Sequence, residues 1–219
     1  SLNYATTKEH NKYLKWCKEK VIEYPVVLPE YTNKKNKKIN PYVFIDNLFD
    51  LLNKNDVVIT GNGSACVISF QAAKIKQGQR LYTNSGSASM GYDLPASIGA
   101  AIALKGKRVI CLAGDGSLMM NLQELQTMKG YKLPIKVFVL NNDGYVSIKQ
   151  TQETYFSDNI SGVGPKSGVS MPNFTELGKA LNIPSMKITK LSELYSATFK
   201  KMFNSNQPGI FEIVIDPSQ

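Results

Sequence analysis

The architecture of this chain is indicated first by the stretch Gly114-Asp115-Gly116-Ser117, which follows the apolar run 109–113. A second polar pair, Asn141-Asn142, follows another apolar run at 135–140. The segment between them is helix-like, so the order is strand, turn, helix, strand, turn. We therefore expect one carboxylate and one carboxamide to lie at the ends of two neighbouring strands, where both can reach one ion.

Asp115 and Asn142 carry the oxygen ligands that a hard divalent cation prefers. Mg²⁺ is usually held by one or two protein groups together with the phosphates of a substrate or cofactor. Asp115 alone would repel a phosphate, whereas Asp115 with bound Mg²⁺ attracts one, and a helix starting near Ser117 adds its N–H groups. Gly-Asp-Gly and Asn-Asn-Asp-Gly are each also common turn sequences. Together, in this order, they predict a metal–diphosphate site.

The rest of the chain alternates between strand-like and helix-like runs. Strands are expected at 57–60, 80–83, 109–113, 135–140, 185–188 and 210–215, and helices at 41–53, 63–76, 95–104, 118–129, 172–181 and 191–203. This alternation predicts an α/β fold, a doubly wound and mostly parallel sheet with helices on both faces. Residues 151–170 lack periodicity and are expected to form a mobile loop.

Three glycine-rich turns, at 61–63, 86–91 and 114–116, follow expected strands. Ligands of open α/β sheets bind outside the carboxyl ends of the strands. Glycine allows the backbone to approach a ligand closely. We therefore expect the three turns to border one binding site.

Residues 1–40 are interpreted as a linker or appendage from a preceding domain, and residues 41–219 as one compact domain. A helix at 13–23 stops before Pro25, and Asn40 followed by Pro41 is typical of a helix start. Nine lysines and four glutamates lie in residues 1–40, so the appendage carries more than half of the net charge of +9. Its basic residues are not interleaved with stacking aromatics on a recognisable motif, and we expect no nucleic-acid partner.

The cysteines Cys17, Cys66 and Cys111 have no metal-type spacing, and no secretion signal precedes them. This pattern favours a reducing cytoplasm, with Cys111 buried in an apolar strand. No apolar run approaches the roughly 18 residues of a membrane span, so no membrane partner is expected. The first residue is Ser1 rather than Met, which is typical of an excised piece.

Three motifs in this order resemble the thiamine diphosphate-dependent enzymes, and in particular the C-terminal pyrophosphate-binding domain of acetolactate synthase-like proteins. The stretch from Gly114-Asp115-Gly116 to Asn141-Asn142 is similar to their GDG and double-Asn signature. Residues 85–100 are similar to the run SGGLGTMGYGLPAAIGA of acetolactate synthases, and residues 121–125 to their N-(I/L)-Q-E-L. The resemblance spans roughly residues 40–216.

The resemblance implies thiamine diphosphate and Mg²⁺ as cofactors. Mg²⁺ would be bound by Asp115, the Asn142 side chain and the Gly144 carbonyl. Met90 would hold the cofactor in a bent conformation, and the Ala88 carbonyl would accept a hydrogen bond from its aminopyrimidine. The other implied cofactor-binding residues are Gly63, Ser64, Gly114, Gly116, Ser117 and Tyr145.

The implied activity is that of a transferase, a 2-oxo acid decarboxylase and carboligase that converts pyruvate to acetolactate or a related product. The resemblance implies that the activating glutamate comes from the N-terminal pyrimidine-binding domain of the same or a partner chain. No catalytic residue is therefore expected in this chain. The protein is expected to form a homo-oligomer. Glu124 is interpreted as structural, and His10, the single histidine, is not expected to be a general base.

Two departures from the family leave the substrate open. Ser64-Ala65 stands where the family often has Gln-His, and Thr151 stands where acetolactate synthases have a tryptophan. Another carboligase, or a cyclic-diketone hydrolase, is therefore an alternative. A non-catalytic nucleotide- or phosphate-binding module, or an assembly module, is the alternative of another class. The sequence gives little support for a nucleotide-binding module, because no G-x-G-x-x-G follows the first expected strand.

Overall fold

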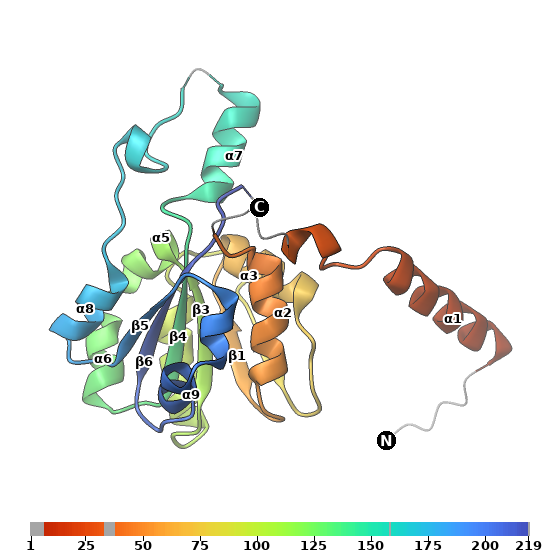
Figure 1. Cartoon of the computed structure of the whole chain (residues 1–219), viewed down its shortest axis with the longest axis horizontal. Coiled ribbons are helices and arrows are strands. Elements are labelled where there is room, and N and C mark those ends of the chain that lie inside the picture. Colours follow the sequence, from red (N-terminus) through yellow and green to blue (C-terminus); the bar gives the residue numbers. More distant parts are fainter. Residues whose placement is uncertain (1–6, 33–37, 158, 219) are drawn as a thin grey trace.

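The computed structural model describes residues 7–32, 38–157 and 159–218. Its described strands form one six-stranded sheet in the order β2-β1-β3-β4-β6-β5, in which every pair is parallel (Figure 1). The strands are β1 (Val57–Thr60), β2 (Arg80–Tyr82), β3 (Val109–Gly114), β4 (Ile135–Asn141), β5 (Ser185–Ile188) and β6 (Gly209–Val214). The predicted α/β fold with a parallel, doubly wound sheet is confirmed.

Helices cover both faces of the sheet because successive strand residues point to opposite sides. Ile110 and Leu112 pack in one apolar cluster with α2 (Pro41–Leu51), α3 (Gly63–Ala72) and α9 (Ala197–Phe203). The alternate residues of the same strand, including Cys111, pack in a second cluster. Its helices are α4 (Asp93–Ala103), α6 (Glu124–Gly130) and α8 (Phe174–Ala180). Cys111 is fully buried, as predicted.

The strand order reverses next to β1. From β1 the chain runs to β2 on one side and returns to β3 on the other, so the connections leave the shared edge of β1 and β3 in opposite directions. Such a switch point opens a crevice at the carboxyl ends of the strands.

The first and last described segments of the sheet layer pair with each other. Ile39 N donates to Val214 O at 3.1 Å, and Asp216 N donates to Ile39 O at 2.8 Å. The Asn40 side chain accepts from Tyr42 N at 2.9 Å, so α2 begins where predicted. The preceding helix α1 (Lys8–Glu23) buries none of its residues and projects away from the sheet (Figure 1).

Two helices predicted as continuous are broken by side-chain hydrogen bonds. The predicted helix 118–129 is divided into α5 (Asp115–Leu118), the 3-10 turn η2 (Met119–Asn121) and α6. Asn121 Nδ2 donates to Gly91 O at 2.8 Å, which holds this segment against the turn before α4. The predicted helix 191–203 is η4 (Leu191–Tyr195) and α9, because Ser196 caps α9 by accepting from Phe199 N at 3.2 Å.

Helix boundaries differ at several ends. The helix predicted to reach Lys76 ends at Ala72, and the helix predicted from 172 begins at Phe174, after its cap Asn173. The loop expectation for 151–170 is wrong at its start, since α7 (Val146–Tyr155) extends into it. No residue of α7 is buried. A helix without a buried face has no apolar residues at helical spacing, which is why the sequence did not predict it. No described helix is both long and apolar enough to cross a membrane.

Candidate functional site

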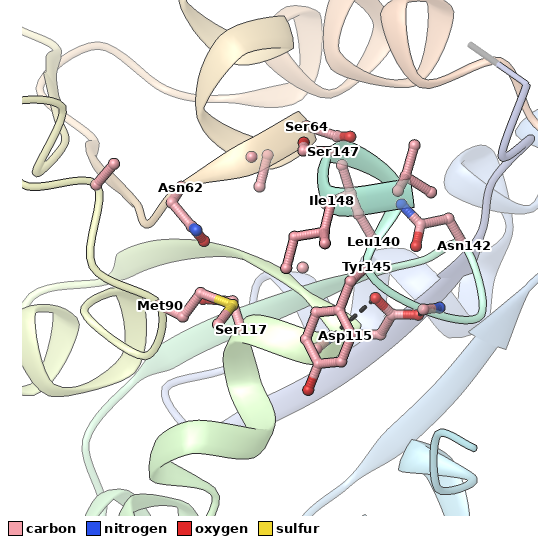
Figure 2. Close-up of a pocket in the computed structure, with 17 residues that line it drawn as sticks. Asn62, Ser64, Met90, Asp115, Ser117, Leu140, Asn142, Tyr145, Ser147 and Ile148 are labelled. Atoms are coloured by element: carbon pink, nitrogen blue, oxygen red, sulfur yellow. Dashed lines mark hydrogen bonds between the residues drawn. The ribbon is translucent and has the colours of Figure 1, made fainter. Parts of the chain in front are cut away.

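A cavity of about 500 Å³ lies at the carboxyl ends of β1, β3 and β4, beside the switch point (Figure 2). Every predicted site residue lines it, namely Gly63, Ser64, Ala88, Met90, Gly114, Asp115, Gly116, Ser117, Asn142, Gly144 and Tyr145. These residues come from four separate turns and from the first residues of the helices that follow. The topology thus brings together groups that are up to about 80 positions apart in the chain.

Six lining residues were not predicted, namely Asn62, Ala65, Leu140, Val146, Ser147 and Ile148. Three of them, at 146–148, form the first turn of α7, directly after the Asn-Asn-Asp-Gly turn. The rule that ligands bind at carboxyl ends of strands could have found this turn. Helix α7 itself was not predicted, because its sequence has no apolar periodicity.

Asp115 joins the turn after β3 to the turn after β4. Its Oδ1 accepts from Gly116 N at 2.8 Å and its Oδ2 from Gly144 N at 3.0 Å. The side chain is almost wholly buried, and this burial raises the pKa of Asp115 to about 6, against the opposing effect of the backbone N–H donors. The site therefore holds a desolvated carboxylate that a cation would stabilise.

The Asn142 carboxamide lies beside Asp115 Oδ1 and the Gly144 carbonyl, and its inward atom is 3.3 Å and 2.7 Å from these two oxygens. With its nitrogen inward, the amide donates to both oxygens, which is the orientation that satisfies these groups without a ligand. With its oxygen inward, the amide, the carboxylate and the carbonyl would together offer three acceptors to a divalent cation. One carboxylate with neutral oxygens is a ligand set that Mg²⁺ accepts when phosphates supply the rest.

Two glycines permit the close contacts around this cluster. A Cβ on Gly116 would lie 2.3 Å from Tyr145 Cε1, so the tyrosine ring packs directly on the Gly116 backbone (Figure 2). Gly144 has φ +148°, and a Cβ there would lie 2.2 Å from Val163 O. Tyr145 N donates to the same Val163 carbonyl at 2.9 Å. Residues near Val163 thereby pack on the loop that carries Asn142.

The start of α3 presents unpaired backbone donors to the cavity. Gly63, Ser64 and Ala65 line it, and the first N–H groups of an α-helix have no intrahelical acceptor. Gly63 has φ +56°, a left-handed conformation that lets the chain turn sharply from β1 into α3. Helix N-termini attract anions, and the small side chains Ser64 and Ala65 leave these N–H groups accessible.

Met90 and Ala88 border the cavity from the turn before α4. The Met90 side chain is 38% exposed and points toward the cavity (Figure 2). Ala88 has φ +49°, a conformation that a non-glycine residue adopts only when its surroundings hold it there. The surrounding fold therefore holds the backbone of Ala88 in this left-handed conformation.

Other residues weighed in the sequence lie outside the cavity lining. Glu124 is the first residue of α6, and His10 belongs to α1, where its backbone N donates to Thr7 Oγ1 at 3.3 Å. Thr151 lies one turn beyond the cavity-lining Ser147 on α7, and its hydroxyl donates to Ser147 O at 3.1 Å.

The fold is that of a doubly wound α/β protein, and its candidate site lies at the switch point, where a buried acid, a carboxamide, a backbone carbonyl and the start of α3 border one cavity. The family described as thiamine pyrophosphate enzyme, C-terminal TPP binding domain, matches residues 61–213. The chain belongs to this family, and the resemblance drawn from its three motifs is confirmed.

Its relatives include several acetolactate synthases. Acetolactate synthase 2, chloroplastic, of Zea mays is 33% identical over 184 residues, which are 82% of this chain and 29% of the relative. Acetolactate synthase isozyme 2 large subunit of Escherichia coli (strain K12) is 33% identical over 160 residues, which are 73% of this chain and 28% of the relative. The chain thus spans under a third of the length of these two relatives.

Proposed function

We propose that this chain is the Mg²⁺- and thiamine diphosphate-binding domain of an acetolactate synthase-like 2-oxo acid decarboxylase and carboligase. The observation that carries the proposal is that residues of the three glycine-rich turns and of the turn after β4 line one cavity, in which the Asp115 carboxylate, the Asn142 carboxamide and the Gly144 carbonyl lie together. Membership of the family supports thiamine diphosphate as the ligand. Beyond the cofactor, we propose the metal, the substrate and the roles of individual residues.

In this proposal Asp115, the Asn142 oxygen and the Gly144 carbonyl hold Mg²⁺, and the diphosphate completes its coordination. Gly63 and Ser64 bind the diphosphate through the N-terminus of α3. On the opposite side, Gly114, Gly116 and Ser117 contact it through the turn after β3, and Tyr145 covers Gly116.

When bound, thiamine diphosphate supplies the carbon nucleophile that attacks a 2-oxo acid. This chain orients it. The Ala88 carbonyl accepts a hydrogen bond from the aminopyrimidine, and Met90 supports the bend between the two rings. The carboxyl that activates the aminopyrimidine is proposed to be a glutamate of a pyrimidine-binding domain, in the same or a partner chain.

The rim of the cavity supports a covering partner. Met90 and Ile148 line the cavity and are 38% and 44% exposed, and Met120, which packs beside Gly91, is 45% exposed. Exposed apolar groups gathered beside a site mark an interaction surface. We infer a homo-oligomer in which another domain closes the cavity, with residues 1–40 as the connection to a preceding domain and 41–219 as the cofactor domain.

Pyruvate is the proposed first substrate. Thr151, on the same side of α7 as Ser147, is a small polar residue one turn from the cavity. It favours a larger or more polar acceptor than a tryptophan would, so another carboligase or a cyclic-diketone hydrolase is the second candidate. The free cysteines Cys17, Cys66 and Cys111 fit a reducing compartment, and the cytoplasm is the proposed one.

Calorimetric titration of thiamine diphosphate into the full-length protein tests the proposal, with Mg²⁺ and with EDTA. Asp115→Asn removes the buried carboxylate beside Asn142 and Gly144, whereas Asp143→Asn removes an exposed carboxylate from the turn that carries these two residues and is the matched control. We expect binding to require Mg²⁺ and Asp115, with Asp143→Asn close to wild type. Metal-independent binding of a nucleotide in its place would support the non-catalytic module.

Turnover separates the remaining alternatives. We expect the full-length oligomer to consume pyruvate and residues 1–219 alone to be inactive. Steady turnover by residues 1–219 alone would contradict the missing glutamate. Acetolactate as the product would favour the first candidate, and cleavage of a cyclic diketone the second.

A further inference from the structure

Asp93 is a buried carboxylate whose role the proposed function does not use. It is the first residue of α4 and is fully buried. Its hydrogen-bond donors are neutral, the Ser117 hydroxyl at 2.7 Å and Leu94 N at 2.9 Å. Within the described residues no cationic side chain forms an ion pair with it. A buried carboxyl without a cation is costly, and the similar run of acetolactate synthases has glycine at this position.

The Ser117 hydroxyl links Asp93 to two turns at once. Gly91 N donates to Ser117 Oγ at 2.9 Å, and the Ser117 hydroxyl donates onward to Asp93 Oδ2 at 2.7 Å. The carboxylate accepts hydrogen bonds but donates none, so it fixes the direction of the Ser117 proton and turns the oxygen lone pair toward Gly91. The turn before α4 and the turn after β3 are thereby joined through one hydroxyl.

The third turn packs against the same carboxylate. A Cβ added to Gly61, at the end of β1, would lie 2.3 Å from Asp93 Oδ2 and 3.1 Å from its Cγ. Gly61 therefore leaves the space that the carboxylate fills. Asp93 thus packs directly against Gly61 and accepts from Ser117, and it is linked to Gly91 through the Ser117 hydroxyl.

We propose that Asp93 is a positioning residue, which sets the three turns around the cavity by accepting a hydrogen bond from the Ser117 hydroxyl. The inference rests on the proposed function for its ligand, a diphosphate with Mg²⁺. With its proton held by Asp93, the Ser117 hydroxyl cannot donate to a phosphate. The main-chain N–H groups of the turn after β3 are then the donors that remain, and Asp93 acts on the ligand only through the geometry of these turns.

Titration of thiamine diphosphate with Mg²⁺ into the full-length protein tests this role. Asp93→Gly and Ser117→Ala should each weaken the affinity by roughly tenfold, the effect of one lost hydrogen bond. The double variant should be no weaker than either single one, because Asp93 acts through Ser117. Asp93→Asn should retain most of the affinity, since its amide oxygen can still accept a hydrogen bond from the Ser117 hydroxyl.

A control variant separates positioning from general destabilisation. Asp56 is another buried carboxylate, paired with Arg108 away from the cavity. Asp56→Asn should lower stability and leave the affinity for thiamine diphosphate unchanged. Equal losses of affinity in Asp56→Asn and Asp93→Gly, or additive effects of Asp93→Gly and Ser117→Ala, would overturn the proposal.

Hydrogen exchange without cofactor gives a readout that does not depend on the proposed function. The Gly91 amide should exchange roughly tenfold faster in Ser117→Ala and Asp93→Gly, but not in Asp56→Asn. If the wild-type protein binds no thiamine diphosphate, the proposed function fails, while this exchange still decides whether Asp93 orders the turn. Unchanged Gly91 exchange in Ser117→Ala, which removes only one oxygen atom, would refute the role even if Asp93→Gly does not fold.

Discussion

Two carboxyls, Asp93 and Asp115, lie buried beside the cavity and are held by neutral donors. They face different neighbours. Asp115 lies beside the Asn142 carboxamide and the Gly144 carbonyl, where we propose that Mg²⁺ binds. Asp93 accepts from the Ser117 hydroxyl, and its charge acts on the buried Cys111 thiol. Two similarly buried carboxyls are thus proposed to have different roles, one as a metal ligand and one as a structural contact.

The burial of Asp93 predicts a pH dependence of stability. Burial raises the pKa of Asp93 above its usual value, with Ser117 and Leu94 N opposing the shift and the buried thiol of Cys111 as its titratable neighbour. In the window just above the unfolded-state pKa of about 3.9, the folded protein binds more protons than the unfolded chain. Stability from this group therefore falls as pH rises through that window.

Asp93→Asn removes this titration, so its stability relative to wild type should increase as pH rises from about 3.5. Urea denaturation of both proteins at several pH values measures the difference, in which the other carboxyls cancel. A difference that does not change with pH would show that Asp93 has an ordinary pKa in the folded protein.

Gly116 makes a second prediction at the scale of one residue. A Cβ there would lie 2.3 Å from the Tyr145 ring, so Gly116→Ala must displace Tyr145 from the cavity wall. We expect at least about tenfold weaker binding of thiamine diphosphate with Mg²⁺, measured by calorimetry. Gly130→Ala is the control, since a Cβ there meets nothing within 4 Å. Equal affinity in both variants would contradict a role for the Gly116–Tyr145 contact.

Sequence reasoning found the residues whose chemistry stands out, such as Asp115 and the glycines of the turns. It missed Asp93, because an acid after a turn is ordinary in a helix N-terminus and only the fold shows that this one is buried against Ser117 and Gly61. The substitution of glycine by Asp93 in the 85–100 run was the available signal.

Among the secondary-structure elements, β4 and α9 are fastened by a buried cation. Lys136 Nζ donates to Met202 O at 2.8 Å, Ser205 Oγ at 3.0 Å and Gln207 O at 2.6 Å. Burial, with the nearby Arg108 charge, lowers the pKa of Lys136 to about 8, yet its three acceptors match the three N–H bonds of an ammonium group. At neutral pH the charged form secures the C-terminal end of α9 to the sheet.

Lys136→Met should therefore lower the free energy of unfolding by about 2–4 kcal/mol, because it leaves buried acceptors without a donor. Lys179→Met removes an exposed pair with Glu176 at 2.7 Å and should cost no more than about 0.5 kcal/mol. Urea denaturation at pH 7 measures both. Comparable losses would show that the three hydrogen bonds of Lys136 have little net value.

The first turn of α7 lines the cavity, and the segment after α7 is tied back to this helix and to Tyr145. Gln152 exchanges two hydrogen bonds with Ser161, each of 3.0 Å, and Val163 O accepts from Tyr145 N. Few apolar contacts back these bonds, since no residue of α7 is buried. Regions of this kind open locally at low cost.

We expect thiamine diphosphate with Mg²⁺ to slow hydrogen exchange in residues 151–170 of the full-length protein, because the ligand would contact Tyr145 and the loop that carries Asn142. The amides of β4 should be unaffected, as they are already in the sheet. Exchange unchanged by the cofactor in 151–170 would refute this ordering. Helix α7 could not be predicted from the sequence, because a helix that buries no residue lacks apolar residues at helical spacing.

For the whole molecule, the alternation of apolar strands and helices was enough to predict a parallel sheet covered on both faces. It did not predict the order β2-β1-β3-β4-β6-β5, which depends on pairing between strands far apart in the chain. Because β1, β3 and β4 are neighbours in this order, the turns that follow them lie side by side. The motifs were enough to predict the site residues, but only the fold shows that these residues lie close together.

The N-terminal segments differ in how they join this fold. Helix α1 buries no residue and exposes Tyr13, Trp16 and Ile22 by 66%, 51% and 80%. Ile39, by contrast, is buried and pairs with β6, and Asn40 caps α2. The chain that precedes residue 25 should therefore be dispensable for stability, and residues 39–40 should not.

Two shortened chains test this boundary. Removal of residues 1–24 should change the free energy of unfolding by no more than about 0.5 kcal/mol and reduce self-association, because it deletes exposed apolar groups. Removal of residues 1–40 should cost about 2–4 kcal/mol, through the lost burial of Ile39 and the lost cap of α2. Urea denaturation and sedimentation measure the two effects. A large loss on removing residues 1–24 alone would mean that α1 packs on the domain in solution, and would move the domain boundary toward the N-terminus.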